Sequence, residues 1–279
     1  MRLLYTCYDP LLPFGLIDVV ERLIDMITST AVPVPTKVRE LTNFAIYVLK
    51  VAGKRELRSL NFIVSGNPDE WLVKHTYNVV GVIAQLMCEM RFPFIEAQKV
   101  IRTVVLHDLG HIPLRNPLPL SDTPEGGDRY RLHVVLGYRL CRELDLSMDE
   151  CDAILTHHEN FDGSGFMSRR GKTIPFYARL MRIADDVEKL VTDQGVSTFN
   201  VMKHFMLYSS KLYDPDMVRW MIATFGPIPT GTTVRIRGEE GMVEGAKDGR
   251  LAVIHLGTRN VEYIPFEKLR NMIQPGEME

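Results

Sequence analysis

Apolar residues from Leu16 to about residue 220 recur every three or four positions, the spacing that places them on one face of a helix. No run in this part of the chain alternates between apolar and polar residues with the two-residue period of a strand. Short groups of Gly, Pro and Asn interrupt the pattern and divide it into separate helices. The pattern therefore predicts a region built from helices alone.

Two of these helices have recognisable starts. The sequence Asn-Pro-Asp-Glu at residues 67–70 offers an N-cap, a proline for the first helical position and an acid, so we expect a helix from there to about Arg91. Ser147, with Glu150 three residues later, fits a capping box for a helix that leads into residues 157–158. The inward stripe of the first helix includes a histidine among apolar residues: Leu72, His75, Val79, Val82, Leu86 and Met90.

The pattern changes near the end of the chain. A glycine and two prolines within residues 226–229 end the helical spacing. Runs typical of strands follow at Thr232–Arg237 and Arg250–Leu256, with an Asp248-Gly249 turn between hairpin arms. A short helical tail, Phe266–Met272, comes last. We therefore expect a small β-rich C-terminal module after the helices.

These changes divide the chain into three parts. Residues 1–66 form an N-terminal helical region without recognisable chemistry, residues 67–225 a helical domain rich in histidine, and residues 226–279 the β-module. The predicted fold class is therefore mainly α. The N-terminal region and the β-module each fit either a packing role or the binding of a protein partner, and the sequence leaves both alternatives open.

Composition limits the class of protein. Of the 279 residues, 46% are hydrophobic and 24% are charged, which is enough apolar material for a core and excludes a disordered chain. The 33 basic and 35 acidic side chains leave a formal charge of −2. Charge therefore gives no support for binding a nucleic-acid polymer or an anionic membrane surface.

Cysteine usage and the apolar stretches indicate a soluble cytoplasmic protein. The four cysteines are Cys7, Cys88, Cys141 and Cys151. They form no Cys-x-x-Cys pair, and a chain of this size does not need disulfides, so we expect reduced core thiols. Asp9, Pro10 and Pro13 interrupt the apolar start before it reaches signal-peptide form. No uncharged stretch of about 18 residues is present for a membrane helix.

Histidines are concentrated in the helical domain. Six of the eight in the chain fall in one stretch of it, residues 75–158, most of them on or beside apolar faces: His75, His107, His111, His133, His157 and His158. One histidine on an apolar face is usually a hydrogen-bonded core residue, but six together need a shared explanation. Asp108 follows His107 at the end of an apolar helix for which Gly110 is the predicted stop. Imidazole and carboxylate ligands without thiolate favour Fe, Mn or Zn in a catalytic site over a structural zinc site.

The order of these residues resembles the HD superfamily of metal-dependent phosphohydrolases, and more narrowly its HD-GYP branch. The superfamily pattern is carried by His75, His107-Asp108, His133, His157-His158 and Asp185. The narrower match lies in His157-His158-Glu159, Phe161-Asp162-Gly163-Ser164-Gly165, Ile174-Pro175, Ala178-Arg179 and Ile183-Ala184-Asp185. Tyr213-Asp214-Pro215 and the β-module that begins near Gly231 also resemble what often follows such domains. The resemblance extends over roughly residues 70–260.

The resemblance implies a helical domain with two divalent transition-metal ions, usually iron or manganese, that hydrolyses cyclic di-GMP. It assigns one ion to His75, His107, Asp108 and Asp185, and the other to Asp108, His133, His157 and His158. Asp108 would bridge the ions, and a hydroxide shared by ions about 3.5–4 Å apart would attack the phosphodiester. Glu159 and Asp186 are candidates for orienting the ligands through hydrogen bonds.

The chain departs from the family pattern at four places. Trp71 stands where some members carry a glutamate for a third metal, which favours a two-metal centre. His111 stands where the family usually has a lysine that reaches the phosphate. An ordinary imidazole carries at most part of a lysine's charge at neutral pH, so phosphate anchoring would weaken as the pH rises. The Gly-Tyr-Pro of the family is here Gly165-Phe166-Met167, and two arginines that clamp the dinucleotide are missing from residues 193–197.

The missing arginines affect substrate binding most. A hydrogen bond between charged groups contributes about 1.5–3 kcal/mol, so two losses would weaken substrate capture by orders of magnitude unless other residues replace them. The candidate substrate contacts are His111, Gly165, Phe166, Arg169, Arg170 and Lys172. The candidate catalytic residues are Asp108 and His111.

Three functions remain open from the sequence. The first is a phosphodiesterase that hydrolyses cyclic di-GMP or a related cyclic dinucleotide. The second is a catalytically weak or degenerate receptor or scaffold, which the altered motifs and the missing arginines favour. The third keeps the chemistry but changes the substrate, as in an HD-type phosphatase or nucleotidase, or a di-iron oxygenase on the same scaffold. All three depend on the same metal centre.

Overall fold

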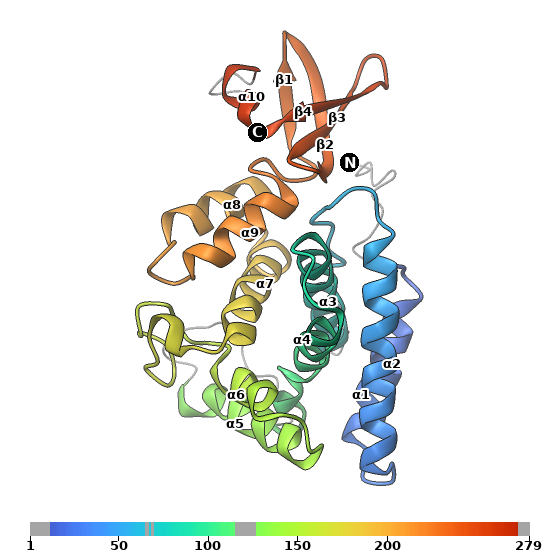
Figure 1. Ribbon diagram of the computed structural model, residues 1–279, viewed down its shortest axis with the longest axis vertical. Coiled ribbons are helices and arrows are strands. Elements are labelled where there is room, and N and C mark those ends of the chain that lie inside the picture. Colours follow the sequence, from blue (N-terminus) through green and yellow to red (C-terminus); the bar gives the residue numbers. More distant parts are fainter. Residues whose placement is uncertain (1–11, 65–66, 68–69, 115–126, 273–279) are drawn as a thin grey trace.

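The helical region is present in the computed structural model, which describes residues 12–64, 67, 70–114 and 127–272 (Figure 1). Within these ranges the mainly α fold class is confirmed. No helix in them has the length and hydropathy to cross a membrane. The helices are α1 (Leu16–Thr28), α2 (Val34–Gly53), α3 (Trp71–Glu89), α4 (Phe94–Leu106), α5 (Gly127–Glu143), α6 (Met148–Thr156), α7 (Phe176–Thr192), α8 (Thr198–Leu207), α9 (Pro215–Phe225) and α10 (Phe266–Met272).

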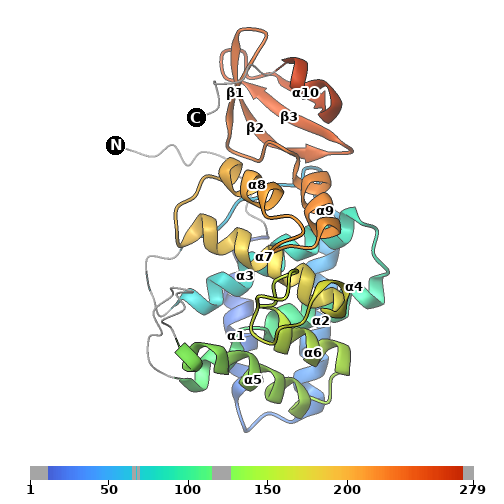
Figure 2. The same ribbon diagram turned by 90° about the vertical axis from the view of Figure 1, so that its left-hand side faces the viewer.

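Helix α3 lies at the centre of the helical body. It packs against α1, α2, α4 and α7, so neighbouring helices cover it on several sides. In Figure 1, α1 and α2 stand together on one side, α5 and α6 lie at one end, and α8 and α9 lie between α7 and the sheet. Figure 2 shows the same arrangement from the side. Side chains that point inward from α3, α4 and α7 are therefore shielded from solvent.

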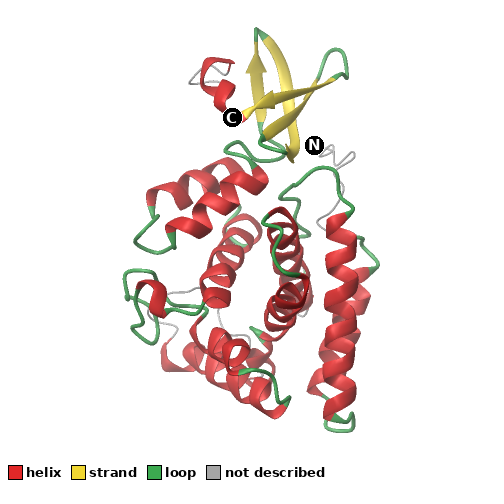
Figure 3. Ribbon diagram, viewed as in Figure 1, coloured by secondary structure: helices red, strands yellow, loops and turns green. Residues whose placement is uncertain are grey.

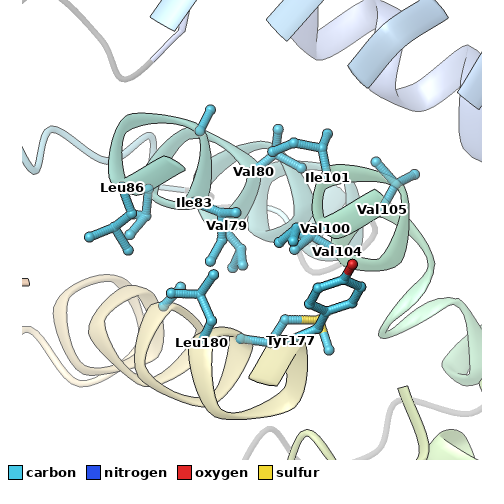
Figure 4. Packing of buried hydrophobic residues seen from close by; sticks show 14 of the residues in the cluster. Val79, Val80, Ile83, Leu86, Val100, Ile101, Val104, Val105, Tyr177 and Leu180 are labelled. Atoms are coloured by element: carbon cyan, nitrogen blue, oxygen red, sulfur yellow. The ribbon is translucent and has the colours of Figure 1, made fainter. Parts of the chain in front are cut away.

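One hydrophobic core unites the helices. Its buried residues run from Leu12 to Phe225, so α1 and α2 share it with the helices that carry the histidines. Figure 4 shows part of this core, where Ile83 of α3 faces Leu180 of α7 and Val104 of α4 lies beside Tyr177. Burying each such Val, Leu or Ile side chain contributes about 1.5–3 kcal/mol. The division into three domains stays a prediction.

One of the two predicted helix starts is confirmed. Ser147 and Glu150 form the capping box at the start of α6, with the Ser147 N–H donating to the Glu150 carboxylate over 3.1 Å. The start predicted at Asn67 is wrong, because α3 begins at Trp71 with Glu70 as its N-cap. The Asn67 carbonyl accepts a hydrogen bond from the Glu70 N–H at 3.1 Å, which makes a turn ahead of the helix. The predicted first-turn residues 68–69 lie outside the described residues.

The C-terminal residues form a four-stranded antiparallel sheet with its own hydrophobic core (Figure 3). The turn at Asp248-Gly249 joins the second and third strands, so the predicted pairing of Thr232–Arg237 across that turn is wrong. The sequence pattern did not predict the strand at Glu239–Lys247, because it is rich in Glu and Gly, which have low strand propensity. The strands are, in spatial order, β1 (Thr233–Ile236), β2 (Glu239–Lys247), β3 (Arg250–His255) and β4 (Val261–Pro265).

Arg58 ties this sheet to the helical body. Its backbone N–H donates to the Ala246 carbonyl at 2.8 Å, and the Ala246 N–H donates back at 2.9 Å. Its guanidinium pairs with Glu89, the last residue of α3, at 3.3 Å. A Cβ atom on Gly245 would lie 2.6 Å from the Arg58 carbonyl oxygen, so this contact requires glycine. The β-module is thus held against the end of α3.

Candidate metal centre

The seven side chains predicted to bind metal come together inside the helical body. Each is buried, with at most 5% of its surface exposed. Their ligand atoms form two groups of four that share Asp108, and within a group all atoms lie within 4.8 Å of one another. The residues are His75 on α3, His107 and Asp108 after α4, His133 on α5, His157 and His158 after α6, and Asp185 on α7.

The first group gathers around His75. Its Nε2 atom lies 3.1 Å from Asp185 Oδ1 and 3.3 Å from Asp108 Oδ2. His107 Nε2 lies 3.1 Å from His75 Nε2 and 3.5 Å from Asp108 Oδ2. These four side chains therefore present two imidazole nitrogens and two carboxylate oxygens to one point.

The second group uses the other oxygen of the same aspartate. Asp108 Oδ1 lies 3.4 Å from His157 Nε2 and 3.5 Å from His133 Nε2. His158 Nε2 lies 3.1 Å from His133 Nε2. Asp108 thus directs one oxygen to each group, which is the arrangement that a bridging carboxylate requires.

Backbone carbonyls fix the orientation of three imidazoles. In each case the Nδ1 atom donates to the carbonyl of the residue three positions earlier, since a carbonyl can only accept. A neutral ring held in this way carries a lone pair on Nε2, directed into the group. The pairs are His107 with Val104 at 2.6 Å, His133 with Tyr130 at 2.5 Å, and His157 with Ile154 at 2.7 Å.

Two residues that were not predicted support the first group. Glu188 Oε2 accepts from His75 Nδ1 at 2.7 Å, and its other oxygen accepts from Asn78 Nδ2 at 2.9 Å. Lys189 donates to Asp185 Oδ2 at 3.0 Å. Both follow Asp185 on α7 at helical spacing, and that spacing was the signal that could have revealed them.

The two residues predicted to orient the ligands have other partners. Glu159 accepts from the backbone N–H groups of Met167 and Arg169, each at 2.5 Å, and so holds the loop that follows it. Asp186 accepts from the Tyr213 hydroxyl at 2.6 Å. The expectation that they orient ligands is therefore not met, because these hydrogen bonds engage the loop after Glu159 and the Tyr213 hydroxyl in place of the ligand imidazoles.

The donor atoms fit a pair of cations. Asp108 Oδ1 and Oδ2, Asp185 Oδ1 and His157 Nε2 are all buried without a hydrogen-bond partner. A buried carboxylate oxygen without a donor is costly, and a cation removes that cost. Burial raises the pKa of Asp108, but the imidazoles of His107, His157 and His75 outweigh it and hold this pKa well below its usual range. Nitrogen and oxygen donors without thiolate suit Fe, Mn or Zn.

Gly110 permits a close helix contact. The predicted helix stop at this residue is wrong, because α4 ends at Leu106 and residues Leu109–Leu114 continue as a 3₁₀ helix, η2. A Cβ atom on Gly110 would lie 1.9 Å from the His133 carbonyl oxygen. Glycine is therefore needed for α5 to bring His133 next to Asp108.

Aromatic rings border both groups. Trp71 stacks on His75 with ring centroids 5.0 Å apart, and His111 stacks on His133 at 4.1 Å. Phe166 lies 4.9 Å from His158, where it borders the second group. Burial lowers the pKa of His111 to about 4, so the ring is neutral at pH 7 and does not carry the partial charge expected from the sequence.

The three basic residues of the loop after Gly165 differ in their partners. Arg169 donates to both oxygens of Asp152, at 2.6 and 2.8 Å. Lys172 donates to Asp214 and Asp216 at 2.7 and 2.6 Å. Arg170 is exposed. Gly165 lies in the same loop. A Cβ atom on it would lie 2.5 Å from the Glu159 Cα atom, so only glycine lets the loop pack this closely against residues 158–160.

Residues 72–190, which include all seven side chains, match the HD domain family. The chain is 24% identical over 155 residues to a cyclic di-GMP phosphodiesterase of Thermotoga maritima, covering 52% of this chain and 42% of the relative. It is 25% identical over 200 residues to a cyclic di-GMP phosphodiesterase of Pseudomonas aeruginosa, covering 67% and 44%. The chain thus spans less than half the length of these curated relatives. A solved HDG"Y"P protein from Bdellovibrio bacteriovorus aligns with a TM-score of 0.48 and 16% identity, over 74% of this chain and 76% of that one.

Proposed function

We propose that this chain, which belongs to the HD-GYP family of the HD superfamily, is a phosphodiesterase that hydrolyses cyclic di-GMP or a related cyclic dinucleotide. Two divalent transition-metal ions, iron or manganese, would be held by the two groups that share Asp108. The observation that carries the proposal is this pair of buried groups, whose inward atoms are imidazole nitrogens and carboxylate oxygens.

Bound metal ions would supply the attacking hydroxide, by lowering the pKa of a shared water, and would offset the charge that builds on the phosphate oxygens. Asp108, between the groups, reduces the repulsion between two cations. Four of the five histidines keep their Nε2 atoms directed inward because carbonyls and Glu188 hold their Nδ1 atoms: His75, His107, His133 and His157. His111, which is neutral, offers a hydrogen bond rather than a charge to the substrate.

A second candidate function is a receptor that binds a cyclic dinucleotide but turns it over slowly. The ion pairs of Arg169 and Lys172 favour it, because these cations already have carboxylate partners. Substrate phosphate would have to displace Asp152 or Asp214 to gain them. The binding of protein partners through residues 1–66 or the β-module stays a prediction.

The proposal is tested with protein purified without oxygen and loaded with Fe or Mn. Incubation with cyclic di-GMP and related cyclic dinucleotides should yield linear products that chromatography separates from the substrate. Removal of the metal by a chelator should abolish turnover and lower the melting temperature, since buried lone pairs and carboxylates would then face one another.

Two variants separate the candidate functions. His107→Ala should lose both metal and turnover, whereas His255→Ala, a matched change in the β-module, should retain both. A fully loaded wild type that binds the dinucleotide without cleaving it would contradict the phosphodiesterase and support the receptor. Cleavage of mononucleotides in preference to cyclic dinucleotides would indicate an HD-type phosphohydrolase with another substrate.

A further inference from the structure

Tyr130, which the sequence pattern did not single out, lies at the edge of the second group. It is on α5, one turn before His133, and is partly exposed. Its ring centroid lies 4.9 Å from that of His133, 5.6 Å from His111 and 5.7 Å from His158. Its hydroxyl oxygen lies 3.5 Å from His158 Nε2. The phenol therefore reaches the nitrogen that this group offers to a metal.

We infer that Tyr130 is a substrate contact whose hydroxyl donates a hydrogen bond to a phosphate oxygen of the bound phosphodiester. The inference rests on the proposed function, because it requires a metal ion on His158. The Tyr130 hydroxyl oxygen lies 3.5 Å from His158 Nε2, so a phosphate oxygen held by an ion on that nitrogen would come close to the phenol. Anionic phosphate oxygens are the strongest acceptors that the substrate brings to the same place.

The cationic side chains near the second group already have other contacts, which leaves a role for the neutral Tyr130 hydroxyl as a hydrogen-bond donor to phosphate. Lys189 is bound to Asp185, and Arg169 is bound to Asp152. The Arg131 guanidinium lies 5.1 Å above the ring of Phe166. Tyr130 and Phe166 are themselves in edge contact, with centroids 6.1 Å apart, so they form one aromatic border beside the second group. A hydroxyl on that border can hold a phosphate oxygen without displacing an existing ion pair.

The residue also has a supporting contact that must be separated from the proposed one. Its backbone carbonyl accepts from His133 Nδ1 at 2.5 Å. Tyr130→Phe leaves that carbonyl and the ring contacts in place and removes only the hydroxyl. Tyr138→Phe makes the same change two turns later on α5, where the side chain packs against the hydrophobic core.

The test measures the affinity of the metal-loaded full chain for inorganic phosphate by calorimetry, together with metal content and the kinetics of cyclic di-GMP hydrolysis. Tyr130→Phe should weaken phosphate binding roughly tenfold to a hundredfold, the effect of losing a hydrogen bond to a charged acceptor. The KM should rise with it, while metal content stays at the wild-type value. Tyr138→Phe should match the wild type in all three measurements.

Each outcome distinguishes this inference from the proposed function. Wild-type affinity for phosphate in Tyr130→Phe, with full metal content, overturns the inference and leaves the metal centre intact. A loss of metal in Tyr130→Phe without a change in phosphate affinity per loaded site also overturns the inference. The hydroxyl would then help His158 to hold metal and would not contact phosphate. A wild type that binds no metal contradicts the proposed function itself, and the inference falls with it.

Discussion

The two halves of the candidate metal centre differ in how their side chains are held. In the first group, two carboxylates face two imidazoles, and Glu188 braces His75 with a third negative charge. In the second group, Asp108 supplies the one carboxylate among three imidazoles, and backbone carbonyls orient His133 and His157. A backbone carbonyl also orients His107 in the first group, so the two halves differ in the side-chain acceptor, Glu188, that only the first has among these hydrogen bonds.

The surroundings differ in the same direction. The first group lies against α3 and α7, where Lys189 donates to Asp185 and Asn78 donates to the supporting Glu188. The second borders Tyr130 and Phe166, side chains of intermediate exposure. Trp71, also of intermediate exposure, stacks on His75, so both groups have an aromatic neighbour and differ mainly in charge. We expect the half with more carboxylates to retain an ion more firmly, and the half beside Tyr130 and Phe166 to meet the substrate. Three changes test this comparison.

Replacing the shared ligand should have the largest effect. Asp108→Asn removes a negative charge and one metal-binding oxygen from both groups, so we expect both ions to be lost. Turnover should fall by about three orders of magnitude or more. Metal analysis of the purified variant checks this, with Asp25→Asn on the exposed face of α1 as the control. Retention of one full equivalent of metal would mean that the halves do not depend on Asp108 equally.

Removing the brace should separate the halves. Glu188→Gln keeps the size of the side chain but removes the charge that faces His75, and changes to such supporting residues cost about tenfold to a hundredfold in metal affinity. We expect that loss at the first group and an unchanged second group, measured by competitive metal titration. An equal loss of metal affinity at both groups would show that Glu188 does not support the first group selectively. Glu143→Gln, at the end of α5, is the control.

Loosening the loop should have the smallest effect. Glu159→Gln replaces one of the two oxygens that accept from Met167 and Arg169, so the loop that carries Phe166 should be held less firmly. We expect faster amide hydrogen exchange in residues 160–171 and a KM raised by a few fold, since one neutral-to-charged hydrogen bond is altered. Metal content should not change. A drop in metal content would place Glu159 in support of His158 instead.

The candidate ligands were predicted mainly through the resemblance to the HD superfamily, because the chain keeps the family's order of His and Asp residues. Helical spacing alone indicated only that several histidines lie on or beside apolar faces. Glu188 was missed although it lies one turn after Asp185, since only packing of α3 against α7 shows that it faces His75. The partners of Arg169 and Lys172 lie on other elements, so the sequence left these cations as substrate contacts. Strand β2 was missed because its glycines and glutamates have low strand propensity. Pairing with β3 and with Arg58 nevertheless holds it in strand conformation, and the sequence pattern does not show these partners.

One carboxylate serving two groups has a consequence for how the centre fills. An ion that engaged Asp108 Oδ2 would alter the charge and orientation of Oδ1 on the same side chain, so the occupancies of the two groups would be thermodynamically linked. By reciprocity, each ion would change the affinity for the other by the same factor. We therefore expect limiting metal to populate singly and doubly occupied molecules in proportions that independent sites would not give.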